Sequence, residues 1–152
     1  MNKAQVQSRL PELRSKAIAW AQQQCQQIVQ LGKPLSTFEI DLAKSVGVTR
    51  PERVRVLEVV QMPMPEDVAL REAATLLGLL GPTMVGITLG YGICMVKGHR
   101  TSGLLAHELR HVFQYEHAGS IEDFLPGYLE QLLLYGYRNA PLEQDACLYE
   151  RA

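Results

Sequence analysis

The chain has 152 residues, of which 47% are hydrophobic, and its formal net charge is -1. This length and composition fit a single folded domain and exclude a largely disordered chain. A net charge so close to zero gives no electrostatic basis for binding nucleic acid or an anionic membrane surface. The three cysteines, Cys25, Cys94 and Cys147, form no CxxC pair. This pattern favours a reducing compartment over a disulfide-stabilised secreted protein.

The N-terminal segment MNKAQVQSRLPELRSK contains no apolar run of the kind that a signal peptide needs. The longest apolar stretch, residues 76–91, is interrupted by Pro82 and several glycines. We therefore expect no transmembrane helix. The sequence predicts a cytoplasmic protein with no nucleic-acid partner and no membrane partner, and it predicts no particular oligomeric state.

The N-terminal part of the chain, residues 1–50, is predicted to be helical. Apolar residues recur at helical spacing over residues 8–31, and Gly32 ends that helix. A second helix is predicted over residues 36–46, where a serine or threonine can cap its first turn. We expect these helices to join the rest of the chain in one domain that spans residues 1–152.

The central part of the chain predicts a small sheet with one helix inserted. β-Branched and alternating residues indicate the strands. The predicted strands are 54–61, 83–89 and 91–96. A helix is predicted to begin at Pro65 and to end near Leu77, since proline suits a first helical turn and acidic residues follow it.

The C-terminal part of the chain predicts three consecutive helices. Ser102 is the expected cap of the first, and Ser120 is the expected cap of the second. The predicted helices are 103–117, 120–135 and 140–150. Helices, then a short antiparallel or mixed sheet, then more helices make an α+β fold, with its core in residues 54–152.

The most informative motif is His107-Glu108-Leu109-Arg110-His111. On an α-helix, residues four apart lie on one face, so the two imidazoles can hold one metal ion between them. Glu108 lies about 100° around the helix from His107. It therefore does not share the same tetrahedron easily, but its carboxylate can reach a water molecule beside the metal. The spacing predicts a catalytic zinc site with Glu108 as the base.

A third protein ligand is expected, because two histidines alone rarely hold a catalytic zinc ion. His117 has the spacing of a third histidine in the pattern HExxHxxGxxH, but Gln114 stands where that pattern needs glycine. A carboxylate from a later helix is the alternative. The carboxylate candidates are Glu122, Asp123, Glu130, Glu143 and Asp145. We favour Glu143, because an intervening helix of about 15 residues lets the chain return antiparallel to the HExxH helix.

Three segments resemble known metallopeptidases. They are a glycine-rich strand at 86–92, the sequence His-Glu-Leu-x-His-Val-x-Gln at 107–114, and Asn-x-Pro-x-Glu-x-x-Ala at 139–146. The chain is similar to the gluzincins, which are HExxH-plus-glutamate metallopeptidases, and especially to small uncharacterised bacterial HExxH proteins. This resemblance covers residues 83–150, under half of the chain.

The resemblance implies a minimal zincin fold that binds Zn²⁺ and cleaves a peptide or protein substrate. It implies His107, His111 and Glu143 as metal ligands and Glu108 as the catalytic base. It also implies that the strand ahead of the HExxH helix is the sheet edge that holds an extended peptide. The residues expected at this substrate edge are Gly90, Tyr91 and Gly92.

Further residues are candidates for orienting the ligands or stabilising an oxyanion. The candidate hydroxyl or imidazole donors that could stabilise an oxyanion are Tyr91, His117, Tyr128, Tyr135 and Tyr137. Arg110 is expected to bind a carboxylate, either that of a substrate or a buried one such as Asp123 or Asp145, and arginine forks usually serve structure. Asp145 is a candidate for orienting a metal ligand by a hydrogen bond without binding the metal itself.

Two alternative functions remain at this stage. A protein that binds zinc but no longer catalyses hydrolysis would act as an interaction module. A DNA-binding regulator would use residues 38–54, which resemble the first half of a helix-turn-helix. Pro51 and the β-branched run that follows disfavour a recognition helix there, and so does the net charge.

Overall fold

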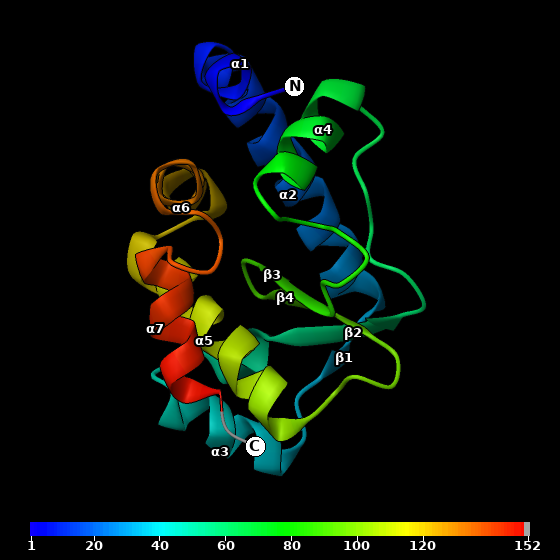
Figure 1. Cartoon of the computed structure of the whole chain (residues 1–152). Helices are drawn as coiled ribbons and strands as arrows, with labels where there is room; N and C mark the ends of the chain where they lie inside the picture. The colour runs from blue at the N-terminus through cyan, green and yellow to red at the C-terminus, as the bar shows by residue number, and fades with distance from the viewer. Residues whose placement is uncertain (151–152) are drawn as a thin grey trace.

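The computed structural model describes residues 1–150 and confirms the predicted α+β class (Figure 1). The helices are α1 (Lys3–Ser8), α2 (Leu10–Leu31), α3 (Thr37–Ser45), α4 (Val68–Leu76), α5 (Ser102–Ala118), α6 (Ile121–Tyr135) and α7 (Pro141–Tyr149). The strands are β1 (Lys33–Pro34), β2 (Arg55–Val59), β3 (Gly86–Leu89) and β4 (Gly92–Val96), and a 3-10 turn covers Pro51–Arg53.

The sheet is mixed, with the strand order β1-β2-β4-β3. β2 and β4 run parallel, whereas β3 and β4 form an antiparallel hairpin in which Leu89 is opposite Gly92. Gly90 opens the two-residue turn of this hairpin with a φ of 65°, a left-handed conformation that glycine adopts without strain. This order makes β3 an outer strand of the sheet.

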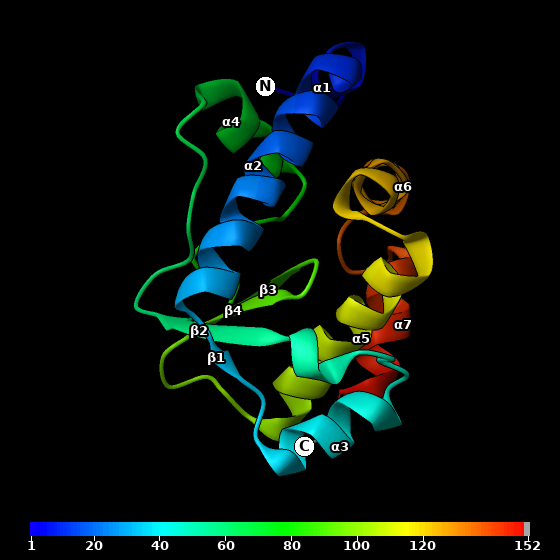
Figure 2. The same cartoon turned by 180° about the vertical axis from the view of Figure 1, so that it is seen from behind.

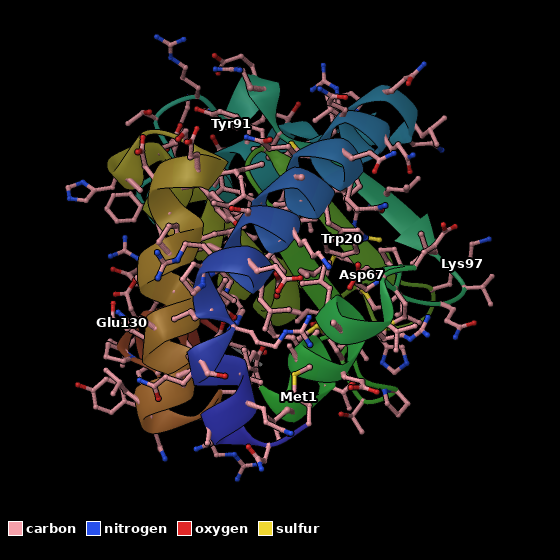
Figure 3. All side chains as sticks on the ribbon, turned by 90° about the horizontal axis from the view of Figure 1, so that it is seen from above. Met1, Trp20, Asp67, Tyr91, Lys97 and Glu130 are labelled. Carbon is pink, nitrogen blue, oxygen red and sulfur yellow. The ribbon has the colours of Figure 1, made fainter. Side chains whose placement is uncertain are left out.

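Alternating side chains of the sheet enter two different cores. Leu89 and Cys94 pack with Ala21 and Ile28 of α2 and with α6. On the opposite face, buried residues of β2 and β4 pack with α5 and α3. The sheet therefore separates α2 from α5, and Figure 2 shows these two helices on opposite sides of it. Seen from above, α2 lies between α6 and α4 (Figure 3).

Three predicted helix starts differ from the observed ones. Residues 3–8 form a separate short helix, and α2 begins at Leu10 instead of residue 8, with a proline in its first turn. α4 begins at Val68 instead of Pro65, because Asp67 caps it by accepting a hydrogen bond from the Leu70 N–H. α5 is capped by Thr101, one residue before the predicted Ser102.

Residues 38–54 contain α3 followed only by the 3-10 turn Pro51–Arg53 before β2 begins. No second α-helix follows α3 within this described segment, so the geometry of a helix-turn-helix is not formed there. Among residues 1–150, no helix combines the length and the apolar character needed to cross a bilayer.

Candidate metal centre

The two histidines of the HExxH motif lie side by side on α5. Their ring centroids are 4.9 Å apart, and each residue keeps only 7% of its surface exposed. The Thr101 side chain accepts a hydrogen bond from the Leu104 N–H and thereby fixes the start of this helix two turns before His107. The imidazoles are therefore held on a buried and rigid helical face.

Glu143 reaches the histidines from α7. One of its carboxylate oxygens lies 3.3 Å from His107 Nε2, and the other lies 3.1 Å from His111 Nε2. One ligand atom from each of the three residues falls within 4.8 Å of the others. Two imidazole nitrogens and one carboxylate match the donor set of a catalytic zinc site with one open position. These residues therefore fit a zinc ion chemically.

A hydrogen-bond chain fixes the orientation of His111. Its Nδ1–H donates to Gln114 Oε1 at 2.7 Å, because the amide oxygen can only accept. The Gln114 amide then donates to the Leu142 carbonyl and to Asp145 Oδ2, each at 2.9 Å. Because one proton is held on Nδ1, Nε2 is the nitrogen that faces Glu143 and would bind a metal once its own proton is displaced.

Arg110 ties α7 to α5 through Asp145, one of the two buried-carboxylate partners expected from the sequence. Its Nε donates to Asp145 Oδ2 at 2.8 Å, and another guanidinium nitrogen donates to the Val46 carbonyl at 2.8 Å. The guanidinium also stacks on the rings of Phe113 and Tyr149. Since Asp145 and Glu143 lie on the same short helix, this contact helps to position Glu143.

Glu108 lies beside the candidate metal ligands but outside their cluster. Its Oε1 accepts a hydrogen bond of 2.8 Å from the Thr88 hydroxyl, and its Oε2 is 3.9 Å from His107 Nε2. A Cβ on Gly86 of β3 would lie 3.2 Å from the Glu108 carboxylate carbon. Because glycine has no side chain, this position of β3 leaves room for the carboxylate. The arrangement suits a proton acceptor next to a metal better than a fourth ligand.

The charges of the cluster are strongly coupled. Burial alone would raise the pKa of Glu143, but hydrogen bonds from His107 and His111 lower it well below its ordinary value. Burial lowers the pKa of His111, yet the Glu143 carboxylate outweighs this effect and raises it to about 9. In the metal-free protein the His111 imidazole therefore holds an extra proton near neutral pH, and a bound cation would displace that proton.

Glu108 has the opposite electrostatic behaviour to Glu143. Burial raises the pKa of Glu108 above its ordinary value, and the nearby charges of His111 and His107 and the Thr88 hydrogen bond offset this only in part. A carboxylate with a raised pKa is better matched to proton transfer near neutral pH than an ordinary glutamate.

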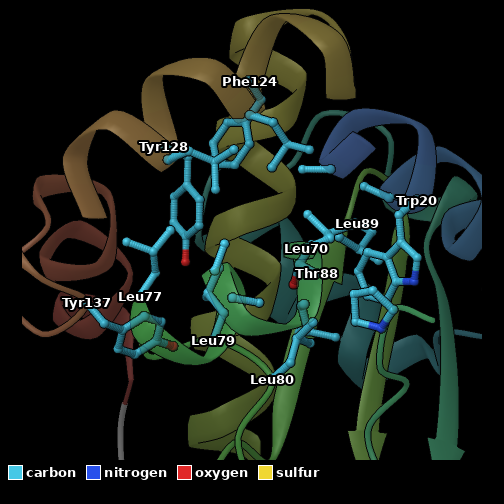
Figure 4. A pocket seen from close by; sticks show the side chains of 18 of the residues that line it. Trp20, Leu70, Leu77, Leu79, Leu80, Thr88, Leu89, Phe124, Tyr128 and Tyr137 are labelled. Atoms are coloured by element: carbon cyan, nitrogen blue, oxygen red, sulfur yellow. The ribbon is translucent and has the colours of Figure 1, made fainter. Parts of the chain in front are cut away.

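Two tyrosines lie close to Glu143. The Tyr128 hydroxyl of α6 donates to Glu143 Oε2 at 2.8 Å. Burial, reinforced by the Glu143 charge, raises the pKa of both Tyr128 and Tyr137, so both remain neutral hydrogen-bond donors. Tyr137 was expected from the sequence as a possible donor near the metal, and its side chain points into the cavity beside this centre (Figure 4).

The other face of His107 has no hydrogen-bond partner. Its Nδ1 is buried, and the nearest carboxylate oxygen, Glu150 Oε2, is 3.8 Å away. The Cys147 thiol and Glu150 can also approach this nitrogen to form a group of three metal-ligating atoms. Both residues are exposed, so the buried set with Glu143 is the stronger candidate for a catalytic metal.

The expectation that Gly90, Tyr91 and Gly92 form the substrate edge is wrong. Gly90 and Tyr91 form the turn between β3 and β4, and Gly92 begins β4, which is paired on both sides. The Tyr91 hydroxyl instead donates to Glu116 at 2.7 Å. The sheet edge next to Glu108 is β3 (Gly86–Leu89), because β3 is the outer strand and the chain reverses direction at Gly90 and Tyr91.

The remaining candidate ligands lie away from the histidine pair. His117 is exposed at the end of α5 and stacks on Phe113, with 5.9 Å between ring centroids, so its predicted role near the metal is wrong. Glu122, Asp123 and Glu130 are exposed on α6. Among the carboxylates considered from the sequence, the structure brings only Glu143 into contact with both imidazoles.

Two residues at this centre, Thr88 and Gln114, were not assigned a role from the sequence, and the contact of Tyr128 with Glu143 was not predicted. Gln114 could have been found, because it lies three residues after His111 and therefore on the same helical face. Thr88 and Tyr128 come from other elements, and local spacing carries no signal for their contacts with the two glutamates.

The chain matches no protein-family model, no curated protein and no solved structure. Any function assigned to it must therefore be supported by the geometry and chemistry of the site itself. Folds alone do not determine function, whereas a constellation of specific side chains can support a definite reaction class.

Proposed function

We propose that the protein is a zinc-dependent hydrolase of the gluzincin type that cleaves an amide bond in a peptide or protein. The observation that carries this proposal is the convergence of His107, His111 and Glu143 within 4.8 Å, with the Glu108 carboxylate beside them. Two imidazoles of one helix, a carboxylate from a later helix and an adjacent free carboxylate are the components of this reaction class.

His107, His111 and Glu143 would hold the zinc ion. A bound zinc ion lowers the pKa of water and polarises a carbonyl group. The chain supplies the orientation that this chemistry needs, because Gln114 fixes the tautomer of His111 and Tyr128 fixes one oxygen of Glu143. A ligand set that is oriented before the metal arrives binds it more tightly.

Glu108 would move the proton in this reaction. Its Oε1 is held by Thr88, so its other oxygen is directed toward the ligand cluster. It would accept a proton from the attacking water and then donate that proton to the leaving amine, as a general base and then a general acid. The raised pKa of Glu108 suits both halves of this transfer.

We also propose a cytoplasmic location, since Cys25, Cys94 and Cys147 are free thiols. A hydrolase in that compartment would meet peptides and proteins as substrates.

The test compares the natural protein with Glu108→Gln after loading with zinc. Elemental analysis should find one zinc ion per chain in both proteins, because Glu108 is not a ligand. Hydrolysis of a mixture of generic peptides should fall about a hundredfold to ten-thousandfold in the variant, since that is the contribution of general acid–base catalysis. Absence of stoichiometric zinc would overturn the proposal. Zinc binding with equal, background hydrolysis of both generic peptides and acyl amides in the two proteins would instead favour the inactive zinc-binding module.

A further inference from the structure

A long cavity opens beside the candidate metal centre. The space between the surrounding protein atoms amounts to about 970 Å³ when the mouth that opens to solvent is included. Its walls come from α2, α4, β3 and α6, and its inner end contains Glu108, His111 and Glu143. Figure 4 shows Tyr128 and Tyr137 on one side of this space and Trp20 and Leu89 on the other.

The walls of the cavity are almost entirely apolar. Apart from the three residues at its inner end, the lining contains no charged side chain and no side-chain amide. The Thr88 hydroxyl already donates to Glu108, and the Tyr128 hydroxyl already donates to Glu143. The polar groups of this site are therefore concentrated at one end of a hydrocarbon-lined space.

The cavity is elongated along α2. Its lining includes residues of this helix from Leu10 to Ala21, and eleven helical rises of 1.5 Å place these two residues about 17 Å apart. This length far exceeds what one amino-acid side chain at a specificity pocket would fill. The shape suits a narrow ligand with one reactive end.

We propose that the cavity binds an unbranched hydrocarbon chain and that the amide bond cleaved joins a long-chain fatty acid to an amino group of the peptide or protein substrate. The acyl carbonyl lies at the cluster of His107, His111 and Glu143, and the alkyl chain lies between α2 and α6. This inference rests on the proposed hydrolase function and defines its substrate. A peptide segment is disfavoured as the occupant of the cavity itself, because its backbone N–H and C=O groups would meet almost no polar partners along these walls.

The reaction is an ordinary hydrolysis. Water adds to the acyl carbon, and Glu108 takes the proton that the water loses. The carbon–nitrogen bond then breaks, and Glu108 returns the proton to the departing amine. The products are a fatty acid and a free amine, and no oxidant, reductant or second substrate is needed.

Trp20 provides a direct readout of binding, because it lines the cavity and is the single tryptophan of the chain. Metal-free protein is titrated with fatty acids that carry a terminal bromine, which quenches tryptophan fluorescence on contact. We expect saturable quenching by the dodecanoic and hexadecanoic acids and none by the butanoic acid at the same concentration. Affinity should increase by up to about fourfold for each added methylene, as expected for full burial of that group.

Two matched variants of α2 test where the chain lies. Ala17 lines the cavity, whereas Ala19 is exposed on the other side of the same helix. Ala17→Phe should fill part of the cavity and weaken binding of the long acids at least about tenfold, since it displaces several methylenes of the ligand. Ala19→Phe should leave this affinity unchanged. Should Ala17→Phe fail to fold, the chain-length series with the natural protein decides the question alone.

A hydrolysis assay, read together with the quenching titration, separates this inference from the proposed function. Zinc-loaded protein should hydrolyse a dodecanoyl amide at least tenfold faster than the matching acetyl amide, and Glu108→Gln should hydrolyse neither. Absence of quenching by the long acids, tighter binding of an apolar peptide, or binding without hydrolysis of the dodecanoyl amide would overturn the fatty-acyl inference. Failure to bind zinc would overturn the proposed function, whatever the quenching result.

Discussion

Two glutamates of α5, Glu108 and Glu116, differ in their hydrogen-bond donors and in the direction of their pKa shifts. Glu116, near the C-terminal end, accepts four hydrogen bonds: from the Thr49 N–H and hydroxyl, the Arg50 N–H and the Tyr91 hydroxyl. Although burial raises the pKa of Glu116, these donors lower it below its ordinary value. Glu108, two turns earlier, has a single side-chain donor in Thr88 and a raised pKa.

The difference separates a structural carboxylate from one that is free to react. Glu116 is surrounded by donors that stabilise its charged form, so it links the loop after α3 and the hairpin turn to α5. Glu108 is more deeply buried but less satisfied, and it faces imidazoles and a cavity. A buried carboxylate without a full set of donors is a functional candidate for this physical reason.

The largest expected effect comes from removing the carboxylate of the ligand cluster. Glu143→Ala should weaken zinc binding by more than about a hundredfold, because loss of a direct ligand should exceed the 10–100-fold effect of losing an outer partner. Glu116→Ala is the matched control, and its zinc affinity should be unchanged although its stability falls. Competition with a fluorescent zinc chelator measures both. Equal zinc affinities in the two variants would remove the distinction between the two ends of α5.

The pH dependence of the metal-free protein should come from the cluster end of α5. The pKa of His111 is raised to about 9 when folded, from about 6.5 when unfolded, so its stabilising charge is fully present below pH 6.5. That contribution is lost as the pH rises through 9. It amounts to about 3 kcal/mol at most, because each pKa unit corresponds to 1.36 kcal/mol. Urea unfolding at pH 6 and pH 9 measures this loss, and His111→Gln should abolish it.

A smaller effect is expected from the residue that orients His111. Gln114→Leu keeps a similar shape but removes the acceptor for Nδ1–H and the donor to Asp145. Zinc affinity should fall about 10–100-fold, the usual effect of removing such a partner. His117→Ala, on the exposed end of the same helix, should leave zinc affinity unchanged. Unaltered binding in Gln114→Leu would mean that the glutamine does not set the orientation of His111.

The smallest effect should come from the structural end of α5. Tyr91→Phe removes one of the four donors to Glu116, which keeps its other three. The free energy of unfolding should fall by about 1 kcal/mol, the net value of a typical hydrogen bond. Zinc affinity and hydrolysis should not change, and chemical denaturation alongside a zinc titration tests both statements. A loss of zinc affinity would show that the two ends of α5 are coupled.

Features that depend on neighbouring residues along the chain could be predicted from the sequence. The order of helices and strands follows from hydrophobic spacing, and the pairing of His107 with His111 follows from the pitch of one helix. Glu143 was chosen because a helical hairpin returns the chain to α5, and this topology is observed. Each of these inferences uses a local period or one short connection.

Features that depend on strand pairing could not be predicted in the same way. The sequence does not show which strand lies at the edge of the sheet, and Gly90–Gly92 therefore looked like the substrate edge, whereas the strand order makes β3 the outer strand. The observed caps, Asp67 and Thr101, differ from the predicted helix starts. Several neighbouring residues can cap a helix, and the local backbone conformation decides which one does. The contact of Thr88 with Glu108 joins a strand to a helix, and no local pattern contains it.

The most direct test of this account is a crystal structure grown with zinc, with diffraction data collected on both sides of the zinc absorption edge. The account predicts one strong anomalous peak bound by His107 Nε2 and His111 Nε2 at about 2.0–2.1 Å and by Glu143 at about 2.0–2.2 Å. The Glu108 carboxylate should lie beside this ion without binding it directly. A zinc ion bound elsewhere, or none between these three side chains, would contradict the account.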